Sequence, residues 1–287
     1  MSLLTFLIVV GAIITSVTVF LKVANIQVTG NTKYTSEEIV AESGIKVGDN
    51  MFMVNKFDVA DRILKKYPYI EQIKIRRHLP DTFTFEITER TPAGYVVSDG
   101  NRWLVDKNAY ILEMIPEGTN VSVPKVVGAE VLAPSVGARL VLKNEDRMKA
   151  LKEVLGALCE TGLCPNVGRI EISKLYSINL IYANRFRVNL GDASELTKKI
   201  EMLKAVINEL NDFDKGEINV SAIKEARFRP NNDIDLSEKP EDSVPSESGA
   251  ESDGKKFGST GENQKDNSDS GTDAGQKEPA PESENKQ

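Results

Sequence analysis

The first hydrophobic pattern in the chain is an uninterrupted apolar run. Residues 3–21 read LLTFLIVVGAIITSVTVFL and carry no charged side chain. A helix of this length spans roughly 28 Å, which is close to the hydrocarbon thickness of a bilayer. A cleaved signal peptide has a shorter apolar core and small residues before the cut, whereas the best candidate cut, after Ala24, has Lys22 three positions before it. We therefore expect a single uncleaved transmembrane helix. Its flanking charges do not decide its orientation.

The segment that follows this run predicts a strand and two helices. Alternation of apolar and polar residues before Gly30-Asn31, a turn pair, predicts a short strand. Thr35 and Glu38 have the spacing of a capping box, so we expect a helix that begins there and ends near Gly44. A second helix fits residues 58–66.

Two further strands complete this first domain, which we place at residues 22–91. Residues 70–78 fit a strand, and Pro80-Asp81 fits the turn after it. Phe83, Phe85 and Ile87 then alternate with polar residues, which predicts a half-buried strand with these three side chains on its core face. The predicted order is β-α-α-β-β.

The second domain, at residues 92–230, is expected to be mainly β with two helices, so the whole chain is α+β. The helix at the domain's C-terminal side has apolar residues at intervals of three and four. The predicted elements are a hairpin over 103–112, a helix over 145–159, strands at 170–172, 177–182 and 187–190, a helix over 194–210 and a last strand over 216–228.

Charge separates the tail from the rest of the chain. Residues 231–287 carry 6 Lys and 15 acidic residues, and only seven of these 57 residues are apolar. Such a segment buries too little surface to offset the entropy of ordering, so we expect an acidic, disordered tail. A solvated tail without a specific role is as consistent with this composition as a functional one.

The composition argues against several function classes. The formal net charge is −7, whereas binding to nucleic acid through phosphates favours a clustered basic excess. Two Cys and one His leave no zinc site of the usual kind, and no phosphate-binding loop is present. His78 has no recognisable nucleophile or carboxylate partner. We therefore predict no enzyme, no catalytic residue, no cofactor and no metal.

Cys159 and Cys164 are the only cysteines, and they enclose Glu-Thr-Gly-Leu. Outside the membrane they could form a disulfide, because Gly162 permits a tight reversal. The alternative is a pair of small, partly buried thiols at the end of a helix.

Four stretches of the first domain stand out: the strand and turn at 26–31, Gly48-Asp49-Asn50-Met51-Phe52, Tyr67-Pro68, and the run from Arg76 through Pro80 to Ala93. They resemble the POTRA domain of the FtsQ family of bacterial division proteins, called DivIB in many Gram-positive species. The second domain resembles the β domain of the same family. The shared features there are Pro124 to Gly128 and the order strand, Leu190-Gly191, long helix, strand.

The resemblance implies a non-enzymatic scaffold of the divisome. It implies one membrane span, a cytoplasmic N-terminus, an extracytoplasmic bulk and enrichment at the septum. The partners it implies are FtsB/DivIC and FtsL, and through them the septal peptidoglycan synthase and FtsW-type proteins, with no nucleic acid. The alternatives are a POTRA component of a secretion or outer-membrane assembly system, and an extracellular wall enzyme.

The same resemblance places the docking surface in the final strand region. From composition alone, the charges at the end of this region would only block pairing at a sheet edge. In the family this region binds FtsB/DivIC, which makes strand addition the expected mode of docking. The residues concerned are Ser221, Ala222, Ile223, Lys224, Ala226, Arg227 and Phe228.

Three arginines of the first domain are a possible secondary partner surface. Arg76, Arg77 and Arg90 flank the predicted strands and could meet acidic partners or lipid headgroups. A solvated face is the alternative interpretation.

Overall fold

A computed structural model describes residues 2–116, 118–119, 121–223 and 225–237 of the chain. Its first element, α1 (Ser2–Phe20), coincides with the predicted apolar helix. Within the described part of the chain, no helix combines the length and hydropathy that a bilayer crossing requires. The predicted transmembrane anchor is therefore not confirmed.

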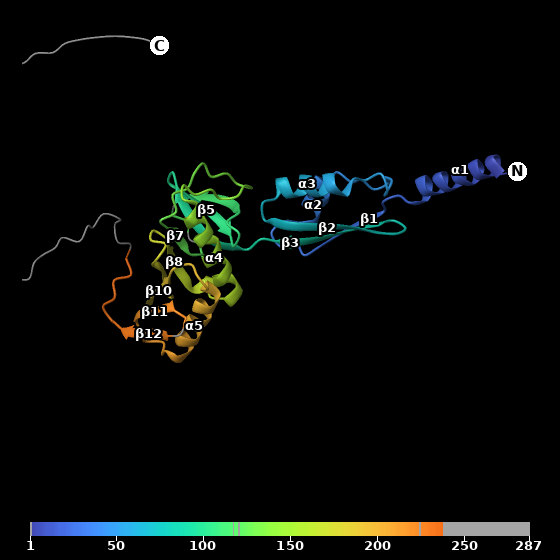
Figure 1. Cartoon of the computed structure of the whole chain (residues 1–287). Coiled ribbons are helices and arrows are strands. Elements are labelled where there is room, and N and C mark those ends of the chain that lie inside the picture. Colours follow the sequence, from blue (N-terminus) through green and yellow to red (C-terminus); the bar gives the residue numbers. More distant parts are fainter. Residues whose placement is uncertain (1, 117, 120, 224, 238–287) are drawn as a thin grey trace, which may run out of the picture. The chain divides into compact units, whose positions relative to one another are not determined.

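The first domain is a three-stranded sheet with two helices, and its elements follow the predicted order (Figure 1). The strands lie in the order β1-β3-β2, with β1 parallel and β2 antiparallel to the central β3. The elements are β1 (Asn25–Thr29), α2 (Ser36–Ser43), α3 (Lys56–Lys66), β2 (Ile70–His78) and β3 (Thr82–Glu89).

The local signals in this domain act as predicted. The Thr35 hydroxyl accepts a hydrogen bond from the Glu38 N–H at 3.2 Å, and the Glu38 carboxylate accepts one from the Thr35 N–H at 2.9 Å. Gly44 ends α2 in the left-handed conformation with a φ of 67°. Phe83 and Phe85 are fully buried, which confirms the predicted register of β3.

The second domain is built on a nine-stranded sheet in the order β12-β11-β10-β9-β8-β7-β4-β5-β6. The strands are β4 (Pro92–Ser98), β5 (Asn101–Asp106), β6 (Ile111–Pro116), β7 (Lys125–Val127), β8 (Val167–Glu171), β9 (Ile178–Tyr182), β10 (Phe186–Gly191), β11 (Gly216–Ala222) and β12 (Glu225–Pro230). The helices are α4 (Glu145–Thr161), α5 (Leu196–Glu209) and a short 3-10 turn, η1 (Cys164–Asn166).

One large core joins α4 and α5 to this sheet. Leu151 and Leu155 of α4 and Ile200 and Leu203 of α5 are fully buried in it, together with apolar residues of β8 to β11. The strand β7 links the two halves of the sheet with only three residues. It forms one pair with β4, Tyr95 with Lys125, and three pairs with β8.

The structure adds one strand to the predicted elements of this domain and corrects another. Residues 92–98 form the strand β4, which was not among the predicted elements. The last strand, predicted over 216–228, is a hairpin of β11 and β12, in which Ala222 pairs with Glu225. The reversal lacks the Gly, Asn, Asp or Pro that would have indicated a turn.

The tail prediction is only partly tested. Arg187 donates a hydrogen bond to the Asp235 carbonyl at 2.5 Å, and Arg169 donates one to the Leu236 carbonyl at 2.9 Å. The stretch 231–237 therefore lies against the sheet, and the prediction of disorder from residue 231 is wrong for it. Residues 238–287, to which the prediction also applied, lie outside the described residues.

Candidate functional site

The strand β12 is an edge of the nine-stranded sheet, and it pairs only with β11. It is held there by a β-α-β unit, because β10 and β11 run parallel and α5 connects them. Gly216 fixes the start of β11 with a φ of 151°. A Cβ at this position would collide with the Arg229 carbonyl oxygen, so the close approach of the two strands requires glycine.

The two faces of β12 differ in character. Ala226 and Phe228 point toward the core, and the Phe228 ring meets Phe186 edge-on at 6.0 Å between centroids. Glu225 and Arg227 are exposed, and they form two hydrogen bonds of 2.9 and 3.1 Å. The hydrogen bonds from Arg227 lower the pKa of the Glu225 carboxyl.

The hydrogen bonds to β11 indicate which backbone groups of β12 face outward. The Asn231 N–H donates to the Lys215 carbonyl at 2.9 Å, and Arg229 and Arg227 are opposite Glu217 and Asn219 in the same register. Bonded and non-bonded residues alternate along an antiparallel ladder. The N–H and C=O groups of Ala226 and Phe228 therefore point away from β11, toward the open edge.

A shallow, mainly basic hollow lies on the face of this sheet opposite the helices. Its volume is about 220 Å³, and it spans β9 to β12 beside the edge. The lining residues are Asn179, Arg187, Asn189, Glu217, Ile218, Asn219, Arg227 and Arg229. Three guanidinium groups next to an open edge favour a partner segment that carries carboxylates.

The predicted docking residues fall on three different structures. Ser221 and Ala222 belong to β11, which is an inner strand, and Ile223 is 44% exposed in the reversal. Lys224 lies outside the described residues. The other three, Ala226, Arg227 and Phe228, lie on β12. The predicted residues thus lie close together, but only Ala226, Arg227 and Phe228 belong to the edge strand of the sheet.

Sequence reasoning missed Arg187 and Arg229, which share the basic hollow with Arg227. Arg187 is 40 residues away from Arg227 in the chain. Only the parallel pairing of β10 with β11 brings it into the hollow, and no short-range pattern in the sequence indicates that pairing.

The three arginines of the predicted secondary surface do not form one surface. Arg76 is exposed and pairs with Glu86 at 2.8 Å. Arg77 donates to the carbonyls of Met51 and Val54, so it holds a loop of its own domain. Arg90 does not lie on a solvated face.

Arg90 forms a largely buried ion pair. Its Nη1 lies 2.7 Å from the Asp106 carboxylate, and its side chain is only 15% exposed. The guanidinium also stacks on the Tyr110 ring at 4.0 Å. A positive charge this far from water needs such a partner, which the sequence did not reveal because Asp106 lies on another strand.

Both cysteines are free thiols in the structure. The hydrogen bond from the Cys164 thiol and the nearby Lys107 lower the pKa of Cys159, whereas that hydrogen bond and burial raise the pKa of Cys164. The two thiols are thus neighbours, and the disulfide stays a prediction.

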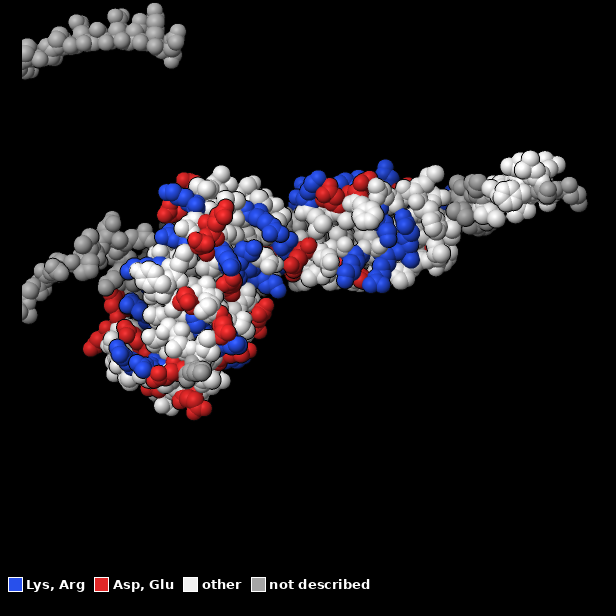
Figure 2. Space-filling model, in the orientation of Figure 1, with Lys and Arg blue, Asp and Glu red and all other residues white. Residues whose placement is uncertain are grey.

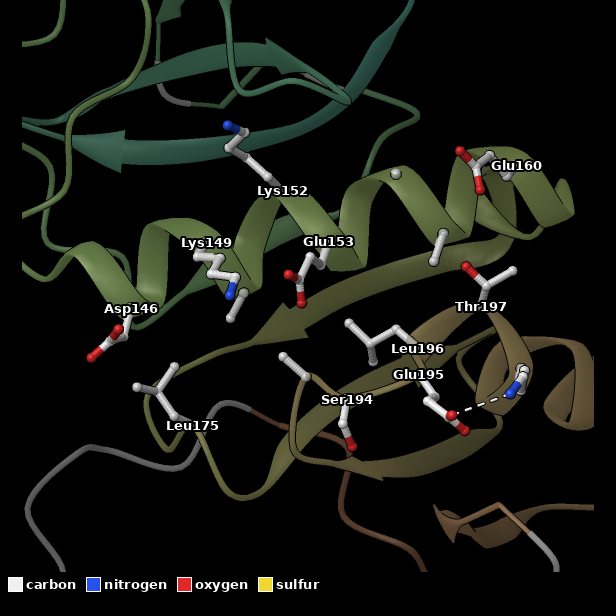
Figure 3. A pocket seen from close by; sticks show the side chains of 15 residues that line it. Asp146, Lys149, Lys152, Glu153, Glu160, Leu175, Ser194, Glu195, Leu196 and Thr197 are labelled. Atoms are coloured by element: carbon white, nitrogen blue, oxygen red, sulfur yellow. Dashed lines mark hydrogen bonds and ion pairs between the residues drawn. The ribbon is translucent and has the colours of Figure 1, made fainter.

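A larger cleft of about 880 Å³ lies between α4 and the start of α5 (Figure 3). Acidic and basic residues alternate along it, among them Asp146, Lys149 and Glu153 on α4. Glu195 pairs with Lys198 at 3.1 Å. Across the described ranges, no group of three potential ligands could hold a metal ion. The mixed charges give this cleft no preference for one class of ligand.

Charges of both signs are interspersed over the face of the molecule that Figure 2 shows. No extensive single-sign surface is visible on that face.

Two family models match the chain. The model described as "POTRA domain, FtsQ-type" matches residues 21–90, and the model described as "Cell division protein FtsQ/DivIB, C-terminal" matches residues 94–229. The chain is also similar to two curated proteins. Cell division protein DivIB of Clostridium botulinum strain Hall is 28% identical over 205 residues, which are 70% of this chain and 79% of that protein. Cell division protein FtsQ of Geotalea daltonii is 26% identical over 196 residues, 67% of this chain and 69% of that protein.

One solved structure is also similar, that of the major extracytoplasmic domain of the trans isomer of DivIB from Geobacillus stearothermophilus. The match covers 43% of this chain and 99% of that chain, with a TM-score of 0.26 and 13% sequence identity.

Proposed function

The chain belongs to the FtsQ/DivIB family of bacterial cell division proteins, and from that membership we propose that it is a non-enzymatic scaffold of the divisome. In this proposal it recruits FtsB/DivIC together with FtsL. These partners connect it to septal peptidoglycan synthesis, which is carried out by the septal synthase with FtsW-type proteins. The residues 22–91 and 92–230 act as its POTRA and β domains.

The observation that carries this proposal is the open edge of β12. The outward N–H and C=O groups of Ala226 and Phe228 can pair with an added strand, which supplies affinity through the backbone. Arg229 stands beside this edge together with Arg227 and Arg187, and an acidic partner segment competes there with Glu225 for Arg227 and with the Asp235 carbonyl for Arg187.

Phe228 is among the predicted docking residues, but its ring packs on Phe186 and the core. Truncating it would disturb the domain itself, so Phe228 is better interpreted as the residue that keeps β12 in place.

The proposal includes a membrane anchor formed by α1, with the N-terminus in the cytoplasm and the bulk outside it. The support is the uncharged run at 3–21 and the exposure of large apolar side chains along α1. Leu3 is 75%, Leu4 72% and Phe6 66% exposed, and a helix of this kind is stable only where lipid or protein covers it.

Ala226→Pro tests docking at β12. Proline removes the outward N–H of Ala226, and an edge strand tolerates this change because no bond to β11 is lost. We expect affinity for the FtsB/DivIC–FtsL complex to fall at least tenfold, or about 1.4 kcal/mol, in calorimetry with the full chain in nanodiscs.

The matched control is Ala226→Val, which keeps the N–H and favours a strand. This variant should bind like the parent. If the proline variant keeps the parental melting curve and also binds like the parent, strand addition at β12 is refuted.

Septal location is tested separately with a fluorescent fusion in dividing cells. We expect enrichment at midcell, and a uniform signal around the membrane would contradict the proposal. Flotation of the full chain with lipid vesicles tests the anchor.

A further inference from the structure

The loop between α2 and α3, together with the first turn of α3, exposes several large apolar side chains. Val47 is 75%, Phe52 52% and Met53 83% exposed in the loop, and Phe57 is 84% exposed at the start of α3. The buried Met51 lies in the middle of the same loop. We refer to Val47, Phe52, Met53 and Phe57 as the apolar tip.

The backbone ties this loop to the residues that directly follow α1. The Val23 N–H donates to the Asp49 carbonyl at 2.8 Å, and the Met51 N–H donates to the Leu21 carbonyl at 3.0 Å. The Gly48 N–H returns a bond of 2.7 Å to the Val23 carbonyl. The apolar tip is therefore attached to the chain within three residues of the C-terminal end of α1.

The turn between β2 and β3 belongs to the same end of the domain. The Ala24 N–H donates to the Asp81 carbonyl at 2.8 Å, which brings this turn next to the same segment. Leu79, at the turn, is 62% exposed.

Arg77 fixes the backbone of this loop. It donates hydrogen bonds to the Met51 carbonyl at 2.9 Å and to the Val54 carbonyl at 2.7 Å. Its guanidinium also lies 5.7 Å from the centre of the Phe52 ring. These contacts fix the backbone so that Met51 enters the core while Phe52 and Met53 point outward.

Two lysines beside the tip can meet anionic headgroups. Lys22 and Lys46 are exposed at its sides. The two nearby acids keep their charge but are held within the loop, because the Asp49 carboxylate accepts the Lys46 N–H at 2.8 Å and the Asp58 carboxylate accepts the Asn55 amide at 2.8 Å.

We propose that the apolar tip inserts into the interfacial layer of the same bilayer that holds α1. This inference rests on the proposed anchor, because an anchored α1 places residues 21–23 at the membrane surface and the loop is bonded to them. Phe and Met side chains then enter the boundary between headgroups and acyl chains, while lysines meet anionic headgroups. The contact gives the first domain one preferred orientation on the membrane.

The test uses tryptophan fluorescence of the full chain in phosphatidylcholine–phosphatidylglycerol vesicles. Trp103 is the only tryptophan, so all variants carry Trp103→Phe to remove its emission. Phe57→Trp then reports on the tip, and Met53→Trp is a second reporter should the first fail to fold. Phe213→Trp is the matched control, because Phe213 is 92% exposed in the second domain.

Vesicles with acyl chains brominated near the headgroup quench tryptophans that enter the interface, which lies roughly 5–10 Å deep. We expect the Phe57→Trp and Met53→Trp emission to shift to the blue and to fall by half or more, and the Phe213→Trp emission to stay unchanged. Unquenched tip reporters in chains that float with the vesicles would overturn the inference while leaving the anchor intact.

The other outcomes are equally decisive. A chain that does not float refutes the anchor and the lipid contact together. Tip reporters that are unquenched by lipid, but become protected from aqueous quencher when the division partners are added, assign the tip to a protein and overturn the lipid contact.

Discussion

Lys199 is fully buried, yet it is a charged residue in the apolar stripe of α5. It is 1% exposed, and its Nζ donates to the carbonyl oxygen and the carboxylate of Asp192 at 3.0 and 2.8 Å. Periodicity assigned Leu196 and Ile200 to the core, but it gave no reason to place Lys199 between them. Only the loop before α5 supplies the partner that makes this burial tolerable.

Asp192→Asn is expected to destabilise the second domain by about 1–2 kcal/mol. Removing one member of a buried pair costs more, but the Asp192 side chain is 62% exposed and water replaces part of its charge. Urea unfolding at neutral pH measures the loss. Lys198→Gln, on the exposed side of α5, should leave stability unchanged within about 0.5 kcal/mol.

The same pair predicts a pH dependence. The hydrogen bonds from Lys199 and Ser194 lower the pKa of Asp192 from its ordinary 3.8 to about 2. Between these values the unfolded chain binds a proton that the folded chain does not. The stabilisation is complete above about pH 4 and is lost as the pH falls through about 2, so the difference between parent and Asp192→Asn should shrink over that range. A constant difference would contradict this assignment.

At the scale of elements, the hairpin of β11 and β12 depends on Gly216. Its φ of 151° and its closeness to the Arg229 carbonyl both exclude a side chain. Gly100 also has a positive φ, 72°, but a Cβ there would meet nothing within 4 Å. A side chain at Gly100 would therefore meet only an unfavourable φ, whereas a side chain at Gly216 would meet both an unfavourable φ and a collision with the backbone.

Gly216→Ala should cost at least about 1–2 kcal/mol more than Gly100→Ala, because only the first adds a collision to an unfavourable φ. Denaturant unfolding of both variants measures the difference. If β12 is the docking edge as proposed, Gly216→Ala should also weaken binding of the proposed partners FtsB/DivIC–FtsL, because the edge shifts with it. Equal costs would show that the two strands can separate without penalty.

The elements of the first domain were predictable because their signals are local. The capping box at Thr35, the glycine at 44 and the alternation around Phe85 all lie within a few residues of the structure they specify. The candidate site was less predictable. The turn at Ile223 has no characteristic residues, and the basic hollow joins Arg187 to Arg227 only through parallel pairing across α5.

At the scale of the whole chain, the body does not end at Pro230. The carbonyls of Asp235 and Leu236 accept hydrogen bonds from Arg187 and Arg169, on β10 and β8. This short return segment, residues 231–237, covers part of the face that carries the basic hollow.

Truncation should therefore have two different outcomes. A chain cut after Ser237 should melt within about 2 °C of the parent, which is the shift expected from roughly half a kcal/mol. A chain cut after Pro230 should melt several degrees lower, because at least two arginine hydrogen bonds are lost, each contributing about 1 kcal/mol. Differential scanning calorimetry of the parent and the two truncated chains measures their melting midpoints. Equal midpoints would show that the return segment adds no stability.

The three-residue strand β7 gives the large sheet an uneven resistance to pulling. It meets β4 at one residue pair, whereas β10 and β11 share four. In the proposed function, a force between α1 and a partner on β12 crosses this seam, where few backbone bonds share the load. We expect the sheet to open first between β4 and β7 under such a force, which would leave β8 to β12 paired and the proposed docking edge intact.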